Sequence, residues 1–151
     1  MKNALRKEFT HTIHVKGDCK VVFKAFCPEA EKKWVSGWES TMLYSKSGIA
    51  EKNCVFKTMQ QNMPETVWIC SVYDVGREVE YVRTTPGQLV SVINITTRQS
   101  GENTECTVKY VHTALTAAGT QYILSHLSEE QFIAQIASWE TAIPIYLENK
   151  F

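Results

Sequence analysis

The segment TVKYVHTAL, residues 107–115, holds the side chains whose types and spacing best suit proton chemistry. Tyr110 and His112 are two positions apart, so on a strand they point to the same face. Lys109 belongs on the solvent side, which directs the other two inward. A histidine beside a tyrosine hydroxyl could orient a ligand or transfer a proton near neutral pH. The alternative, which we favour, is a hydrogen-bonded core histidine, because buried polar groups usually find partners.

Arg83 is a second residue with two interpretations. It follows Tyr81 by two positions and shares its face of a strand. If both point inward, the guanidinium could bind a carboxylate or an oxyanion of a ligand. We favour an outward or rim position for Arg83, since an unpaired buried ion is unfavourable.

The sequence lacks the residue patterns of metal binding, nucleophilic catalysis and phosphate binding. His11 and His14 are three apart on a predicted strand and therefore point to opposite faces. No cysteine pair has zinc spacing, and nucleophile motifs and glycine-rich phosphate loops are missing. Cys70 and Cys106 fall within strands and are expected to be small core residues. We expect no metal site and no cofactor, and we leave the catalytic residues unassigned.

The charge balance bears on partners and location. Lys plus Arg and Asp plus Glu both number 16, which argues against nucleic acid and against electrostatic membrane docking. No apolar run approaches the roughly 20 residues of a membrane helix, so we expect no membrane insertion. Without a visible signal peptide, the five scattered cysteines favour a reduced, cytoplasmic protein. A homodimer is left open.

The elements that must position these residues follow from periodicity. Residues 9–16 alternate as a strand, and Asp18 is a fair N-cap for a short helix over 19–26. Pro28 suits the start of a second short helix, which Gly37 ends. Six further strands are predicted at 38–45, 53–60, 65–74, 78–85, 88–99 and 104–116. The turn-rich links between them are short, so the strands should be antiparallel neighbours.

The end of the chain is predicted to be a long helix over 128–148. Ser128 and Gln131 form a capping box, and Pro144 should bend the last third. One apolar stripe follows from Phe132, Ile136, Trp139, Ile143 and Leu147. An antiparallel sheet and this stripe must bury each other, which predicts a single α+β domain over 1–151. A curled sheet around a helix can leave a pocket between them.

The order of these elements resembles the START-like helix-grip fold, and short words in the chain resemble one branch of the SRPBCC superfamily. The words are PEAEKKWVSGWES, NCVFKT, ETVWICSVYD, EVEYVRTTPG, CTVKYVHTALTAAG and WETAIPIYL, in order along nearly the whole chain. The matching positions are Pro28, Glu31, Trp34, Trp38, Val55, Phe56, Trp68, Tyr73, Tyr81, Pro86, Gly87, Tyr110, Thr113 and Leu115. The resemblance implies a helix-grip fold in which a curved seven-stranded antiparallel sheet surrounds the C-terminal helix, with two short helices between strands 1 and 2.

The resemblance leaves three functions open. Relatives bind sterols, lipids, polyketides or plant hormones, catalyse cyclisation or dehydration, or activate chaperones. We expect a small hydrophobic molecule to bind between the sheet and the long helix, and the alternatives are a polyketide cyclase/dehydrase-type enzyme using Tyr110 and His112, or a protein-interaction module. The residues expected to contact the ligand are Trp34, Trp38, Trp68, Tyr81, Tyr110, His112, Phe132, Ile136 and Trp139. The same aromatic set could instead form a solid core.

The pair Trp34 and Trp38 flanks Gly37 at the joint between the second short helix and the six strands. Both rings could pin the short helices to the sheet, which we favour because such joints must bury apolar area. Alternatively, they close the mouth of a cavity.

Overall fold

The computed structural model describes residues 3–59 and 64–149. They form one seven-stranded sheet in the order β1-β7-β6-β5-β4-β3-β2, with every neighbouring pair antiparallel. The strands are β1 (Arg6–Lys16), β2 (Ser40–Tyr44), β3 (Val55–Thr58), β4 (Thr66–Asp74), β5 (Glu78–Thr85), β6 (Leu89–Ser100) and β7 (Asn103–Ala114). Consecutive strands from β2 to β7 are neighbours, as predicted, and β1 closes the order by pairing with β7.

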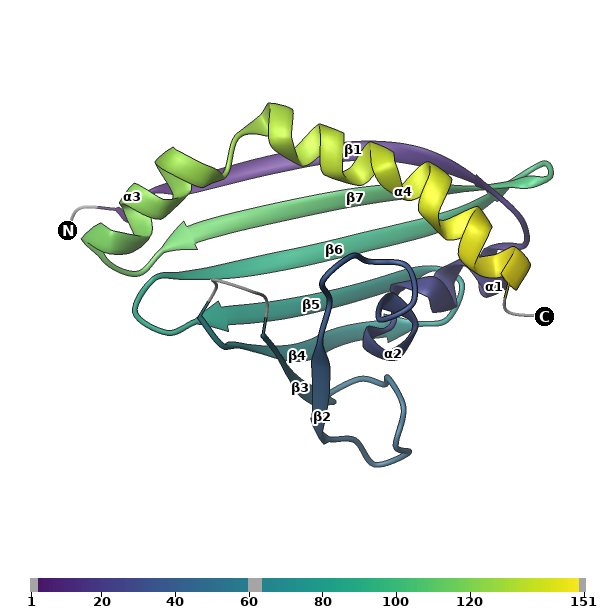
Figure 1. Cartoon of the computed structure of the whole chain (residues 1–151), viewed down its shortest axis with the longest axis horizontal. Coiled ribbons are helices and arrows are strands. Elements are labelled where there is room, and N and C mark those ends of the chain that lie inside the picture. Colours follow the sequence, from purple (N-terminus) through teal and green to yellow (C-terminus); the bar gives the residue numbers. More distant parts are fainter. Residues whose placement is uncertain (1–2, 60–63, 150–151) are drawn as a thin grey trace.

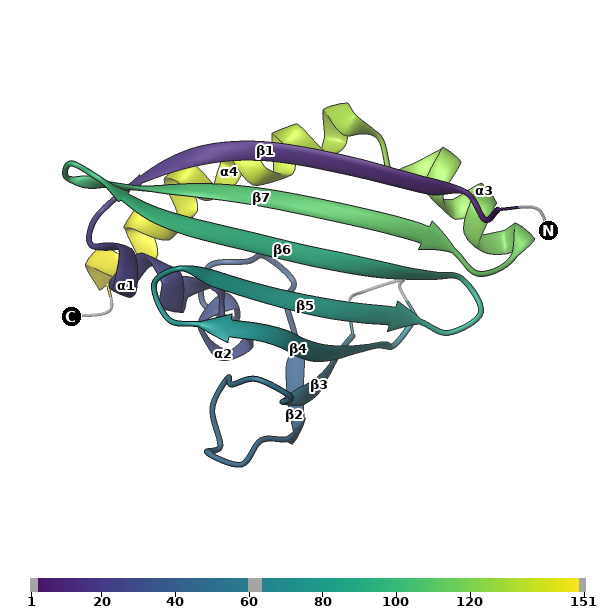
Figure 2. The same cartoon turned by 180° about the vertical axis from the view of Figure 1, so that it is seen from behind.

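The helices gather on one face of the curved sheet (Figures 1 and 2). They are α1 (Cys19–Phe23), the 3-10 turn η1 (Lys24–Phe26), α2 (Pro28–Glu31), α3 (Ala117–His126) and α4 (Glu129–Asn149). Figure 1 shows α4 running diagonally over β1, β7 and β6, while α1 and α2 lie near its C-terminal end. The curled sheet and α4 therefore form two layers with the core between them.

Alternation along the strands decides which side chains enter the core. On β1, Phe9, Ile13 and Val15 are buried while the residues between them are more exposed. The stripe of α4 is buried at Phe132, Ile136, Trp139 and Ile143. Because the two apolar surfaces face each other, the predicted helix-on-sheet packing is confirmed.

The predicted helix starts are confirmed as well. Asp18 accepts a hydrogen bond from the Lys20 amide (2.9 Å) and caps α1. Before α4, the Ser128 hydroxyl accepts from the Gln131 amide (3.1 Å), and the Gln131 side chain accepts from the Ser128 amide (3.3 Å). This reciprocal capping box fixes where α4 begins, and the helix runs on through Pro144.

Helix α3 was missed by the sequence analysis, which extended the last strand to residue 116. Thr116 is its N-cap and accepts from the Gly119 amide. The helix buries only Gly119 and Ile123, so it shows no apolar stripe of the kind that revealed α4. A Cβ on Gly119 would lie 1.8 Å from the Gln88 carbonyl oxygen, so glycine lets α3 approach the β5–β6 turn.

The predicted bounds of three elements also differ from the structure. Helix α2 ends at Glu31 instead of near Gly37, although Gly37 does adopt a positive φ of 75° at the reversal. The strand predicted over 38–45 spans only Ser40–Tyr44. For the strand predicted over 53–60, the structure shows Val55–Thr58, and residue 60 is outside the described residues.

Candidate functional site

A cavity of about 250 Å³ lies between the sheet and the helices. Strands β1, β3, β4, β5, β6 and β7 supply one wall, and α2, the α3–α4 joint and α4 supply the other. Its wall is mainly aromatic and aliphatic, interrupted by a few polar side chains. This composition is typical of small-molecule sites.

Seven of the nine predicted ligand residues line this cavity: Trp38, Trp68, Tyr81, Tyr110, His112, Phe132 and Trp139. Ile136 is fully buried in the packed core instead. Trp34 lines a separate groove with residues of α4. That any of these side chains contacts a ligand stays a prediction.

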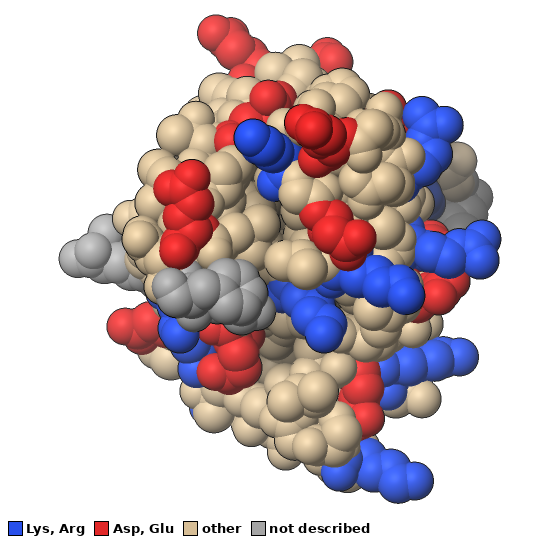
Figure 3. Space-filling model, turned by 90° about the vertical axis from the view of Figure 1, so that its right-hand side faces the viewer, with Lys and Arg blue, Asp and Glu red and all other residues tan. Residues whose placement is uncertain are grey.

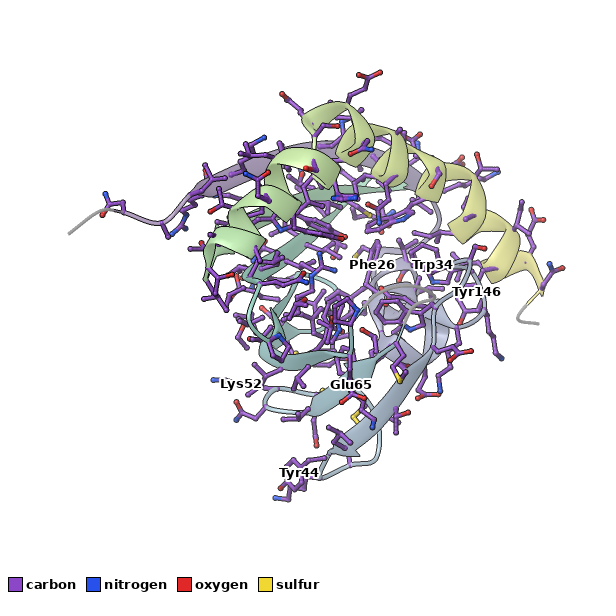
Figure 4. The ribbon with its side chains drawn as sticks, turned by 60° about the vertical axis from the view of Figure 1, so that its left-hand side comes forward. Phe26, Trp34, Tyr44, Lys52, Glu65 and Tyr146 are labelled. Carbon is purple, nitrogen blue, oxygen red and sulfur yellow. The ribbon has the colours of Figure 1, made fainter. Side chains whose placement is uncertain are left out.

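Trp34 does not line the cavity but packs against Trp139, which does. Its ring packs edge-on against Trp139 with centroids 5.5 Å apart, and edge-on against Phe26 at 6.2 Å. Figure 4 shows Phe26 and Trp34 side by side near Tyr146 of α4. Trp34 therefore supports the ring of Trp139, which does line the cavity.

Both tryptophans of the joint are tied to the short helices. The Trp34 Nε1 donates to the Ala25 carbonyl oxygen (2.8 Å), and the Trp38 Nε1 donates to that of Pro28 (2.9 Å). These bonds support the pinning interpretation for both rings. Trp38 in addition forms part of the cavity wall.

The rings on the sheet side have their polar atoms satisfied. Trp68 donates from Nε1 to the Thr58 hydroxyl (2.8 Å) and stacks on Phe56, with centroids 5.4 Å apart. The Tyr81 hydroxyl donates to the Phe26 carbonyl oxygen (2.8 Å). Because these hydrogen bonds are made to the protein, the rings offer a ligand apolar surface in fixed positions.

His112 is both a hydrogen-bonded core residue and part of the cavity wall. It is 2% exposed, and its Nδ1 lies 2.7 Å from the Ser91 hydroxyl oxygen on β6. Burial, with the charge of Arg83 second, lowers the pKa of His112 to about 4. The imidazole is therefore neutral at pH 7 and is not a strong acid there.

Arg83 lies on the inner face of β5, so the predicted outward position was wrong, whereas its partial exposure at the cavity wall fits the predicted rim position. Its guanidinium carbon lies 5.2 Å from the ring centroid of Trp68 and 5.9 Å from that of Tyr110. Burial lowers the pKa of Arg83, yet no carboxylate among the described residues lies within ion-pair distance of it. The guanidinium is only partly removed from solvent, and two aromatic ring faces replace part of the hydration that it loses.

Glu31 is one of several polar wall residues that the sequence did not predict, with His126, Ser128, Gln131 and Gln135. It comes from the last turn of α2, and burial raises its pKa from 4.5 to about 8. Its backbone oxygen accepts from the Val35 amide (2.8 Å), and Glu31, Val35 and Trp38 all line the cavity. A carboxylate at helical spacing from apolar residues was the available signal, since such spacing puts it on the same face.

Tyr110 is affected electrostatically by both charged groups. Burial raises the pKa of its hydroxyl to about 12, while Arg83 lowers it and Glu31 raises it by smaller amounts. Its hydroxyl makes no hydrogen bond to another residue in the described ranges. The site thus combines a cation, a carboxyl group and a phenol around an apolar space.

Two comparisons found no match: no family model fits the chain, and no curated protein is similar to it. Solved structures do match. Norcoclaurine synthase from Thalictrum flavum, solved with dopamine and hydroxybenzaldehyde, has a TM-score of 0.69 and 9% identity over 97% of this chain and 89% of its own. Ara h 8.0201 has a TM-score of 0.70 and 13% identity over 96% and 99%. DynU16, a protein of the dynemicin biosynthetic locus, has a TM-score of 0.64 and 12% identity over 93%, and this chain spans about half its length (47%).

These structures share the helix-grip architecture described above. The chain has the START-like helix-grip fold, as the order of its predicted elements indicated. At 9–13% identity the likeness concerns the fold, and the site must be argued from its own residues.

The remaining site predictions concern metals, thiols and membranes. Within residues 3–59 and 64–149, no three His, Cys, Asp or Glu side chains form a group that could hold a metal ion. Cys70 and Cys106 are buried core residues, as expected. Among the described helices, none has the length and apolar character needed to cross a membrane. On the face in Figure 3, acidic and basic side chains are interspersed.

Proposed function

We propose that this protein binds a small, largely apolar molecule in the cavity between its curved sheet and α4. The observation that carries the proposal is the cavity itself, about 250 Å³ in volume and walled by rings whose polar atoms bond elsewhere. A pocket of this size that is open to solvent leaves apolar ring surface in contact with water. A ligand that displaces the water buries this surface, which favours binding.

The fold gives independent support. A norcoclaurine synthase with the same architecture has been solved with dopamine and hydroxybenzaldehyde, which are small aromatic molecules. For this chain, we infer an aromatic or otherwise flat apolar ligand, because Trp68, Phe132 and Trp139 surround the space with ring faces and edges.

The second candidate function is catalysis of the cyclase or dehydrase kind. It is favoured by one observation, the Glu31 carboxyl in the cavity wall together with the Tyr110 hydroxyl. A carboxyl with a pKa of about 8 can both accept and donate a proton near neutral pH, whereas His112 is neutral there and bonded to Ser91. Glu31 therefore replaces His112 as the proposed acid–base residue. The Tyr110 hydroxyl would form a hydrogen bond to the substrate.

The binding proposal is tested with N-phenyl-1-naphthylamine, an uncharged apolar dye that fluoresces when it leaves water. We expect saturable binding with a dissociation constant in the micromolar range. Ile93→Trp places an indole in the cavity from β6 and should abolish binding. The matched control Ile69→Trp makes the same change on the outer face of β4, where Ile69 is 41% exposed, and should bind normally. Equal binding by both variants would place the dye outside the cavity and reject the proposal.

A further inference from the structure

Arg83 is a cation with no anion. The six ion pairs among the described residues all involve other side chains. The segments outside the described residues, 1–2, 60–63 and 150–151, contain no aspartate or glutamate. No side-chain carboxylate of this chain is therefore available to pair with Arg83.

The environment of Arg83 compensates only part of its charge. Trp68 and Tyr110 present ring faces to the guanidinium at 5.2 and 5.9 Å, and such contacts are worth roughly 0.5–2 kcal/mol each. The guanidinium is partly shielded from solvent, so a partner would still be favourable. No hydrogen bond from it is present among the described residues, so its five donors at the cavity wall are available to an acceptor from outside the protein.

The guanidinium is also held in position. Arg83 lies opposite Trp68 in the β4–β5 register, and the indole is fixed by its bond to Thr58. The neighbouring wall residues Tyr110 and His112 are neutral at pH 7, because burial raises the pKa of the phenol to about 12 and lowers that of the imidazole to about 4. Glu31, the carboxyl of the cavity wall, is not within ion-pair distance of Arg83, and burial raises its pKa to about 8, so it is largely protonated and uncharged at pH 7. The wall residues therefore do not neutralise the positive charge of Arg83.

We propose that Arg83 makes the cavity selective for carboxylates carried on an aromatic or apolar body, with the carboxylate against the guanidinium and the body among the aromatic rings. Planar guanidinium and carboxylate groups form paired, charge-assisted hydrogen bonds, which are stronger than neutral ones. Such a ligand would supply the missing anion and fill the apolar space at once. This inference rests on the proposed binding function and names the class of ligand.

The test compares two probes of the same shape by calorimetry at pH 7: 2-naphthoate, which is anionic, and 2-acetylnaphthalene, which replaces one carboxylate oxygen by a methyl group and is neutral. We expect 2-naphthoate to bind about tenfold more tightly or better, the gain typical of a hydrogen bond to a charged group. In Arg83→Met the order should reverse, because a carboxylate in an apolar space without a cation loses its hydration uncompensated. Arg77→Met removes an exposed arginine from the β4–β5 turn and should leave the preference unchanged.

The outcomes separate the two proposals. If 2-acetylnaphthalene binds the native protein as tightly as 2-naphthoate, or if Arg83→Met keeps the anion preference, the carboxylate inference is overturned while the apolar cavity stands. If neither probe nor the naphthylamine dye binds, the binding function fails and the inference fails with it. Arg83→Lys, which keeps the charge, should retain part of the preference even if the methionine variant does not fold.

Discussion

The carboxyl of Glu31 makes a testable contribution to the pH dependence of stability. Its pKa is about 8 in the folded protein and 4.5 without the protein's influence, so between these pH values the folded chain holds one proton more than the unfolded chain. The free energy of unfolding therefore falls as pH rises through this window, and it is unaffected below pH 4.5, where both states are protonated. Glu31→Gln removes the titration and keeps the shape of the side chain.

The size of the effect follows from the shift. A difference of 8 − 4.5 = 3.5 pH units corresponds to about 5 kcal/mol at 1.36 kcal/mol per unit. The side chain is not completely buried, and solvent screening reduces the effect, so we expect about 2–4 kcal/mol. The measured quantity is the stability of Glu31→Gln minus that of the native protein, which should rise by this amount between pH 5 and 8.

The assay is urea unfolding of both proteins at half-unit pH steps from 4.5 to 9. Taking the difference cancels other titrations, including that of His112, whose lowered pKa makes stability rise with pH between about 4 and 6.5. Glu29→Gln on the same helix is the control, because Glu29 is exposed and its contribution should be small. A flat difference for Glu31→Gln would mean that this carboxyl is hydrated and does not face the cavity.

Three further predictions concern stability. Arg83→Met should raise the free energy of unfolding by about 1 kcal/mol in urea at pH 7, because it removes a partly buried charge that has no carboxylate partner, and a clear loss would show that Arg83 already has a partner. Gly119→Ala should lower the midpoint of thermal unfolding strongly, since its Cβ would lie 1.8 Å from the Gln88 carbonyl oxygen. The expected loss of stability is about 2 kcal/mol or more. An unchanged midpoint would refute this packing of α3. Trp34→Phe loses the hydrogen bond to the Ala25 carbonyl and should lower the free energy of unfolding by about 1–2 kcal/mol, while the affinity for the dye stays within twofold. A large loss of affinity with normal stability would instead favour the alternative that Trp34 closes the mouth of the cavity.

Much of the fold could be predicted because the hydrophobic periodicity of the segments and the turn residues between them indicate the same elements. The capping box at Ser128 and the stripe of α4 marked the long helix to within a residue. Helix α3 could not be found in this way. Its packing depends on one glycine, Gly119, approaching the Gln88 carbonyl, and that contact joins residues about 30 positions apart. Local patterns carry no information about it.

The site was less predictable than the fold. Strand alternation placed Tyr110 and His112 on the inner face, where the structure has them. It could not place Arg83, because the benefit of the Trp68 and Tyr110 rings depends on how three strands are aligned. Glu31 was overlooked for a different reason. A glutamate near the start of a helix is usually explained by the helix dipole, so its sequence position did not indicate a site.

We propose that the space between the sheet and α4 holds a small apolar molecule. A crystal structure of the protein grown with N-phenyl-1-naphthylamine tests it most directly. We expect density for the naphthalene ring within van der Waals distance of Trp68, Phe132 and Trp139, with the surrounding side chains in the positions described. Dye bound only on the outer surface, or a cavity closed by its own side chains, would contradict it.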